Sequence, residues 1–307
     1  MIATLELQAF APALVNGLVT AAFYGLIAIP LVLSFRVSRS VAFVHGGIAT
    51  FTGVLYWWLS SDLDVSGTRH WGQWPALLCV VALGAVTGLL YGLLTMIRMK
   101  TWPRVAVTTF SLGAMLFLFG ITDSLWNPDF SIPSPFGDHR YKVLGQFVTF
   151  HQLVTLSIVV ALACLLSLLV NRTRVGMYVR AIADDIETAE MVGIPVEWVA
   201  VGVWTFAGGL AALSGVLVLV FFRVTVLTVL IVFLRALVVG VLGGFDSLPL
   251  ILLGALVLGE VESVVGSGVF GQVSAATREL VLMGLLFGSV FIVNRLRRAS
   301  ADLLESH

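Results

Sequence analysis

Charged side chains are scarce in this sequence. Only 11% of its 307 residues are Asp, Glu, Lys or Arg, whereas 59% are hydrophobic, and the formal net charge is zero. This composition excludes a water-soluble globular protein, and no basic cluster indicates a nucleic-acid partner. The mean hydropathy of +1.04 and repeated apolar stretches of about 20 residues predict helices that cross a lipid bilayer. We therefore expect an all-α, polytopic transmembrane bundle that forms a single domain over residues 1–307, surrounded by membrane lipids.

Cysteine is equally rare, and so are the basic residues that begin a secretory signal. Cys79 and Cys164 lie in apolar stretches without other metal ligands nearby, so we interpret them as small core residues and expect no metal site. No Lys or Arg precedes Arg36. The basic region of a signal peptide is therefore missing, and the first apolar stretch is expected to remain as a span.

Sequence motifs of common enzyme classes are also absent. The chain has no Gly-Lys dipeptide and hence no phosphate-binding loop, no His-Glu-x-x-His motif and no Gly-x-Ser-x-Gly elbow. We expect no catalytic residue and no cofactor bound by this chain. An intramembrane enzyme built on His45 and Glu262 stays open as an alternative.

Nine apolar stretches are candidate spans, and we expect about eight to nine spans, of which two could be re-entrant or broken helices. Cytoplasmic loops carry an excess of Lys and Arg. With the N-terminus outside and the C-terminus inside, eleven basic residues fall on the cytoplasmic side and five on the other. The candidate spans are 12–34, 41–59, 75–97, 104–126, 152–170, 199–222, 227–244, 248–267 and 278–294.

The loop at 171–199 carries charges of both signs and no apolar core of membrane length, and the orientation places it in the cytoplasm. Asp184 is a candidate N-cap with Glu187 as its capping-box partner, and Gly193 and Pro195 end the helix. The predicted helix of about two turns is too short to be stable alone, so it must dock on something.

The same helix presents a small apolar face made by Ile186, Ala189 and Gly193, beside an acidic one. One interpretation is an ordinary amphipathic surface helix. The other is a contact element for a soluble partner on one side of the membrane.

Two further segments interrupt the apolar pattern. The segment 127–150 is rich in Pro and turn-forming residues, which predicts an external loop without a long helix. The segment 240–249 contains Gly243 and Gly244, an Asp-Ser pair and a proline. It is either a plain cytoplasmic turn or a broken helix that lines the pathway, because irregular backbone at membrane depth needs protein or a water-filled cavity beside it.

Ionisable residues inside the spans are few. Each of Arg235, Glu260 and Glu262 costs roughly 2.5–3.5 kcal/mol to insert, so they should face the bundle and pair. Arg235 and Glu262 are the expected pair because their spans are antiparallel and joined by one short turn. We favour a structural ion pair over direct contact with a solute, and we favour a structural role for His45 near the cytoplasmic interface.

Small residues also recur every four positions inside two spans. Gly84, Gly88 and Gly92 form one series, and Ala207, Ala211 and Gly215 form the other. Such series let helix backbones approach closely, so they predict helix packing. A transporter remains as the function. Intramembrane polar relays are sparse and no internal repeat is evident, which favours a separate motor subunit over an ion-coupled secondary transporter, the main alternative.

The chain resembles the permease subunits of branched-chain amino acid ABC importers, of the LivH/LivM type, along nearly its full length. The order and spacing of several short stretches carry this resemblance. They are Asn16-Gly17 with Tyr24–Ile29, Phe43–Gly46 with His45, Arg174–Met177 with Arg180–Asp185, Ala189–Ile194, Arg235–Gly244, and Leu256–Gly259 with Glu262.

The resemblance implies a bacterial inner-membrane complex with a second permease subunit, two cytoplasmic ATPases that use ATP, and an extracytoplasmic solute-binding protein. It implies that the helix at 184–194 couples to the ATPase and that the bundle alternates between outward- and inward-facing states. The implied coupling residues are Arg180, Asp184, Asp185, Ile186, Ala189, Glu190 and Gly193. The candidate pathway or bundle-polar residues are Asn16, Tyr24, His45, Arg235, Gly243, Gly244 and Glu262.

The sequence departs from the family pattern near these stretches. Ala42 and Gly47 replace polar residues around the His-Gly pair, Pro30 replaces a usual glycine, and Glu260 adds a carboxylate. Phe245 and Asp246 follow the last glycine of the pattern, where small apolar residues are usual. The solute therefore stays open between a leucine-like solute, another amino acid, urea and an amide.

Overall fold

The computed structural model describes residues 2–61, 72–99 and 103–267, apart from a few positions near 130–145 and at 223, 246 and 247. Beyond Ser267 it describes only isolated positions, so the predicted span at 278–294 and the basic tail lie outside the described residues. The elements in chain order are α1 (Ile2–Ser38), α2 (Val44–Ser60), α3 (Gln73–Met99), α4 (Arg104–Trp126), β1 (Arg140–Val143), β2 (Gln146–Thr149), α5 (Phe150–Arg172), α6 (Arg174–Asp184), α7 (Ile186–Met191), α8 (Val196–Leu219), α9 (Val226–Leu242) and α10 (Leu248–Gly266).

The polytopic helical bundle predicted from composition is confirmed. Within the described part of the chain, six helices are long and apolar enough to cross a membrane: α1, α3, α4, α5, α8 and α10. The stretches predicted as spans at 41–59 and 227–244 form α2 and α9, which have 17 residues each. These two helices are shorter than the roughly 20 residues that a crossing helix needs.

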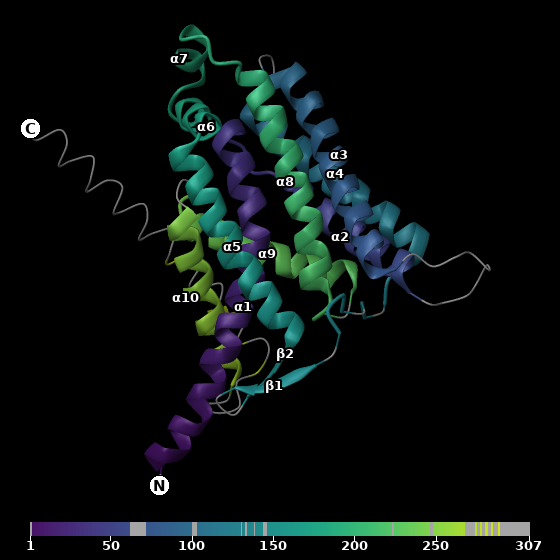
Figure 1. Ribbon diagram of the computed structural model, residues 1–307, viewed down its shortest axis with the longest axis vertical. Coiled ribbons are helices and arrows are strands. Elements are labelled where there is room, and N and C mark those ends of the chain that lie inside the picture. Colours follow the sequence, from purple (N-terminus) through teal and green to yellow (C-terminus); the bar gives the residue numbers. More distant parts are fainter. Residues whose placement is uncertain are drawn as a thin grey trace, which may run out of the picture.

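The two helices at the centre of the bundle are α1 and α8. In their apolar windows 83% and 72% of the residues are buried, compared with 28% in α4 and 22% in α5. The outer helices expose leucine, valine and phenylalanine side chains, as expected for surfaces that face lipid. Figure 1 shows α1 and α8 running along the long axis, with α6 and α7 at one end and the hairpin β1–β2 with the N-terminus at the other.

Helices α3 and α8 approach each other through their glycines. A Cβ atom on Gly208 of α8 would collide with the carbonyl oxygen of Gly84 and would lie 2.8 Å from the Cα of Gly88, both in α3. Gly92 lies against the Trp204 side chain in the same way. The prediction that the small-residue series allow close helix packing is therefore confirmed.

The segment 127–150 corrects the expectation of a purely helical protein. It contains the antiparallel hairpin β1–β2, in which Arg140 pairs with Thr149 and Val143 with Gln146. Thr149 then begins α5 with a capping box, because its hydroxyl accepts from the Gln152 N–H and the Gln152 side chain accepts from the Thr149 N–H. As predicted, the segment has no long helix.

The segment after α9 is a tight turn. Gly244 and Phe245 have φ angles of +66° and +58°, a region that glycine adopts freely and phenylalanine rarely. The Phe245 side chain compensates by stacking on Phe35 of α1 with ring centroids 4.7 Å apart. Of the two interpretations of this segment, the structure shows the turn, which reverses the chain from α9 into α10.

The α3–α8 contact generates a prediction with a neighbouring control. Gly208→Ala must push the two helices apart, and overpacking of this kind costs roughly 1–3 kcal/mol. Gly209→Ala should be neutral, because its Cβ would meet only ordinary contacts at 3.6 Å or more. Thermal unfolding of the two purified variants in detergent measures the difference. Equal midpoints would contradict the packing that we describe.

Candidate functional site

A polar cluster lies inside the bundle where α1, α9 and α10 meet. The Arg235 Nη1 atom lies 2.5 Å from Glu262 Oε1, and the side chains of these residues are only 14% and 12% exposed. The Tyr24 hydroxyl donates to Glu262 Oε2 and accepts from Arg235 Nη1 at 3.0 Å. The predicted ion pair is confirmed, and Tyr24 joins it from a helix more than 200 residues away in sequence.

Close packing of α10 on α1 brings this cluster together. A Cβ on Gly259 would lie 2.5 Å from the Ala21 nitrogen and 2.6 Å from the Gly17 carbonyl oxygen, so only glycine fits there. One turn further on, the Ser263 hydroxyl donates to the Ala13 carbonyl at 2.6 Å. Glu260 does not join the ion pair. Its carboxylate lies against Gly17, and its Oε2 has no hydrogen-bond partner among the residues described.

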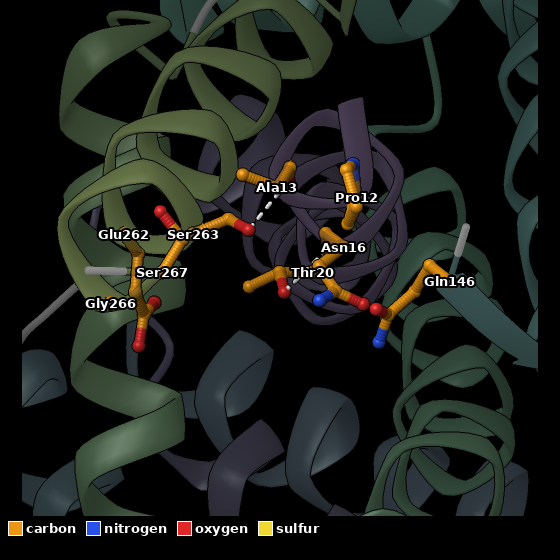
Figure 2. A pocket seen from close by; sticks show the side chains of 9 residues that line it. All are labelled: Pro12, Ala13, Asn16, Thr20, Gln146, Glu262, Ser263, Gly266 and Ser267. Carbon is orange, nitrogen blue, oxygen red and sulfur yellow. Dashed lines mark hydrogen bonds between the residues drawn. The ribbon is translucent and has the colours of Figure 1, made fainter. Parts of the chain in front are cut away.

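A cavity of about 470 Å³ opens between α1, β2 and α10 next to the cluster. Its volume is within the range of small-molecule sites in proteins. Figure 2 shows Ser263 of α10 directed at Ala13 of α1, and Asn16 of α1 beside Gln146 from the start of β2. The cavity brings together two of the predicted pathway residues, Asn16 and Glu262, and Tyr24 and Arg235 contact Glu262 beside it. The lining residues are Pro12, Ala13, Asn16, Thr20, Gln146, Glu262, Ser263, Gly266 and Ser267.

The other predicted polar and glycine residues lie elsewhere. His45 is fully buried in α2, where its Nε2 lies 2.9 Å from Ser34 Oγ and its ring stacks on Trp204. It shares neither a hydrogen bond nor the cavity with Glu262 in the described part of the chain, which removes the geometric basis for an enzyme built on these two residues. Gly243 and Gly244 form the α9–α10 turn and do not line the cavity.

The loop at 171–199 contains two helices, where the sequence analysis predicted one. Helix α6 buries Gly176, Val179 and Ile182, which recur every three residues along one face. Arg180 donates to the Val170 carbonyl at 2.6 Å and so ties α6 back to the end of α5. Arg39, just after α1, donates to the Ala183 carbonyl near the end of α6. These contacts anchor the loop to the bundle.

The predicted N-cap of the second helix is wrong by one residue. Asp184 is the last residue of α6, and Asp185 has the extended backbone of a cap and accepts from the Thr188 N–H at 2.8 Å. Glu187 is therefore not the capping partner. The bond from the Thr188 N–H lowers the pKa of the Asp185 carboxyl, because it stabilises the charged form. Gly193 takes the predicted left-handed conformation, with φ of +84°.

The apolar face predicted for this helix turns partly inward. Ala189 is buried and Ile186 packs against the core of the chain itself. The outward apolar side chains at the end of α7 are Met191 and Val192, which are 78% and 71% exposed. We call these two residues the α7 apolar surface. Sequence reasoning missed them, although large apolar residues in a segment without a membrane-length core were a visible signal.

The ion pair generates a double-mutant prediction. Arg235→Ala leaves the Glu262 carboxylate buried without its cation, a loss that costs roughly 3–5 kcal/mol. We expect low yields of folded protein and a lower unfolding midpoint. Arg235→Ala combined with Glu262→Gln should restore much of the stability, because the remaining group is neutral and can still bond to Tyr24. Failure of the double variant to recover would contradict a structural pair.

The cap of α7 generates a pH-dependent prediction. Since the folded-state pKa of Asp185 is lowered, the bond to Thr188 contributes at pH values above the ordinary aspartate pKa and is lost as the pH falls through the lowered one. Amide hydrogen exchange at Thr188 should therefore lose protection in acid. Asp185→Asn should remove this pH dependence, whereas Asp184→Asn should retain it. An unchanged acid response in Asp185→Asn would exclude Asp185 as the cap.

Comparison with known proteins agrees with this architecture. The family model described as "Branched-chain amino acid transport system / permease component" matches residues 13–290. No solved structure matches the chain. The chain is 30% identical to the fructose import permease protein FrcC of Rhizobium meliloti over 168 residues, which cover 51% of this chain but only 44% of that protein.

Two further relatives match over most of their length. The high-affinity branched-chain amino acid transport system permease protein LivH of Salmonella typhimurium is 25% identical, with 81% of this chain and 83% of LivH covered. The corresponding protein BraD of Pseudomonas aeruginosa is 24% identical, with 92% and 93% covered. Because the family model covers most of the chain, this protein belongs to the family of branched-chain amino acid transport permease components.

Proposed function

We propose that this chain is the transmembrane permease subunit of an ATP-binding-cassette importer for branched-chain amino acids or related small polar solutes. It would work by alternating access in the bacterial inner membrane, with ATP hydrolysed on a separate subunit. Family membership over residues 13–290 supports a permease, and the names of LivH, BraD and FrcC support import of small polar solutes. The complex would contain a second permease subunit, two cytoplasmic ATPases and an extracytoplasmic solute-binding protein.

The proposed topology has the N-terminus outside and the C-terminus inside. It comprises eight or nine crossings, to which α2, α9 and the stretch at 278–294 contribute. The distribution of basic residues supports this orientation. Arg36 and Arg39 at the end of α1 lie at the same end of the bundle as Arg172, Arg174 and Arg180, as the bond from Arg39 to α6 requires. An excess of Arg is typical of the cytoplasmic side.

Coupling to an ATPase is supported by the α7 apolar surface. Met191 and Val192 are more than two-thirds exposed at the end of α7, which follows a helix that is bonded to the bundle. Large apolar side chains exposed outside the membrane spans are typical of a site of contact with another protein. In this proposal Asp185 and Gly193 define the two ends of α7, and Ile186 and Ala189 hold α7 on the bundle while the surface contacts the ATPase.

Helix α1 offers a route from this surface to the cavity. Arg39 bonds to the end of α6, and α1 continues without a break from Ser38 to the cavity residues Thr20 and Asn16. A movement of α6 and α7 would therefore be transmitted along one helix to Tyr24 and to the lining. This arrangement supports alternating access driven from the cytoplasmic side.

An ion-coupled carrier is the second candidate. The buried Tyr24–Arg235–Glu262 cluster is the observation that favours it, because ionisable groups inside a membrane protein mark proton or ion pathways in many carriers. The anchored α6–α7 element favours the ATPase-coupled permease, since a carrier driven by an ion gradient needs no docking surface for a motor.

The proposal predicts the effect of a charge on the α7 apolar surface. Met191→Asp should leave the bundle folded, because the side chain is exposed, but should lower stimulation of the partner ATPase by roughly tenfold or more, as for a central interface residue. Met191→Leu keeps an apolar side chain and should retain stimulation. Ile186→Asp should uncouple as well, with an added loss of packing. The measurement is ATP hydrolysis by the co-purified complex in lipid vesicles. Normal hydrolysis and transport by Met191→Asp would remove this surface from the mechanism.

A further inference from the structure

The cavity between α1, β2 and α10 has an unusual pattern of hydrogen-bonding groups. The Thr20 hydroxyl donates to the Asn16 carbonyl at 2.9 Å, and the Ser263 hydroxyl donates to the Ala13 carbonyl. Each hydroxyl has one hydrogen, so these two groups use their donor on the helix backbone. Toward the cavity they offer oxygen lone pairs.

The remaining polar lining adds further acceptors, among them a carboxylate whose charge Arg235 balances. Glu262 is the charged residue among the described lining residues, and each of its oxygens accepts one bond, from Arg235 or from Tyr24. An ionised carboxylate has about four acceptor positions, so two remain. The side-chain amides of Asn16 and Gln146 supply two more oxygens, and the same amides are the N–H donors among the described lining side chains. Oxygen acceptors therefore outnumber donors.

The lining is also poor in apolar surface. Its apolar members among the residues described are Pro12, Ala13 and Gly266, and none of these described lining residues is a leucine, an isoleucine, a valine or an aromatic residue. A branched aliphatic side chain placed here would exchange water for polar groups and gain little hydrophobic free energy. The cavity volume of about 470 Å³ accommodates a solute of a few heavy atoms together with water.

We propose that this cavity is a transit site selective for small solutes that are rich in N–H donors and poor in aliphatic surface, and that Asn16, Thr20 and Ser263 determine this selectivity. The matching group is the ammonium of a short polar amino acid or the N–H groups of a small amide. This inference rests on the proposed permease function and deepens it by naming the solute chemistry. A polyol fits less well, because each of its hydroxyls brings an acceptor with every donor.

Protection of a thiol in the cavity tests the inference. The full-length chain in lipid nanodiscs, with Cys79→Ala and Cys164→Ala as background, would carry Ser267→Cys as reporter and would be labelled with a membrane-impermeant maleimide. Methylammonium and acetamide are the N–H probes, and leucine and glycerol are the comparison solutes. We expect the N–H probes to slow labelling at concentrations at least fivefold lower than leucine or glycerol require.

The lining is tested with an isosteric substitution and a matched control. Thr20→Val keeps the side-chain shape and removes one acceptor, which should weaken protection by the N–H probes roughly fivefold to tenfold, the effect of one hydrogen bond. Thr109→Val on α4 removes a hydroxyl with the same bond to its own helix, Thr109 to the Val105 carbonyl at 2.9 Å, but outside the cavity. This control should leave protection unchanged.

Each outcome decides the inference. Protection by methylammonium alone supports it with an ammonium as the recognised group, protection by acetamide alone supports it with an amide, and protection by both supports their shared N–H chemistry. Equal or better protection by leucine or glycerol, no protection by either N–H probe, or an unchanged response in Thr20→Val would overturn it. A chain that fails here but still stimulates its ATPase through Met191 would refute the site and leave the permease function standing.

Discussion

The buried contact between Arg235 and Glu262 is the constraint on which the arrangement of this bundle depends. An ionised group inside a membrane protein is costly unless it is paired, so α9 and α10 must hold these two side chains within bonding distance. Tyr24 extends the constraint to α1, because its hydroxyl bonds to both partners. The turn at Gly243–Phe245 and the glycine contact between α10 and α1 make this geometry possible, and the polar cavity lies directly beside it.

Helix α1 also connects the two ends of the molecule. At one end Arg39 bonds to α6, and at the other Asn16 and Thr20 line the cavity. The glycines of α3 and α8 build a tightly packed neighbouring unit. A helix that contacts both the α6–α7 element and the cavity gives a physical basis for coupling, because closely packed helices move as units between discrete arrangements.

Much of the helical architecture could be predicted from the sequence, because apolar length and unpaired charge are strong constraints in a membrane. The Arg235–Glu262 pair followed from two charges on neighbouring antiparallel spans, and the left-handed Gly193 followed from its place before Ile194-Pro195. The N-cap of α7 could not be predicted correctly, because Asp184 and Asp185 are equally good caps by residue type and only the backbone conformation distinguishes them. The hairpin was missed because its four-residue strands carry almost no periodic signal. The part played by Tyr24 and the cavity depend on packing between segments at opposite ends of the chain, which no local pattern encodes.

The central claim is that the bundle has no driving force of its own and is moved from its α6–α7 end by a nucleotide-hydrolysing partner. Solute uptake into vesicles that contain the purified chain alone, under an imposed proton or sodium gradient, measures this most directly. We expect no uptake above that of empty vesicles until the ATPase, the solute-binding protein and ATP are supplied. Gradient-driven accumulation of solute by the chain alone would contradict it.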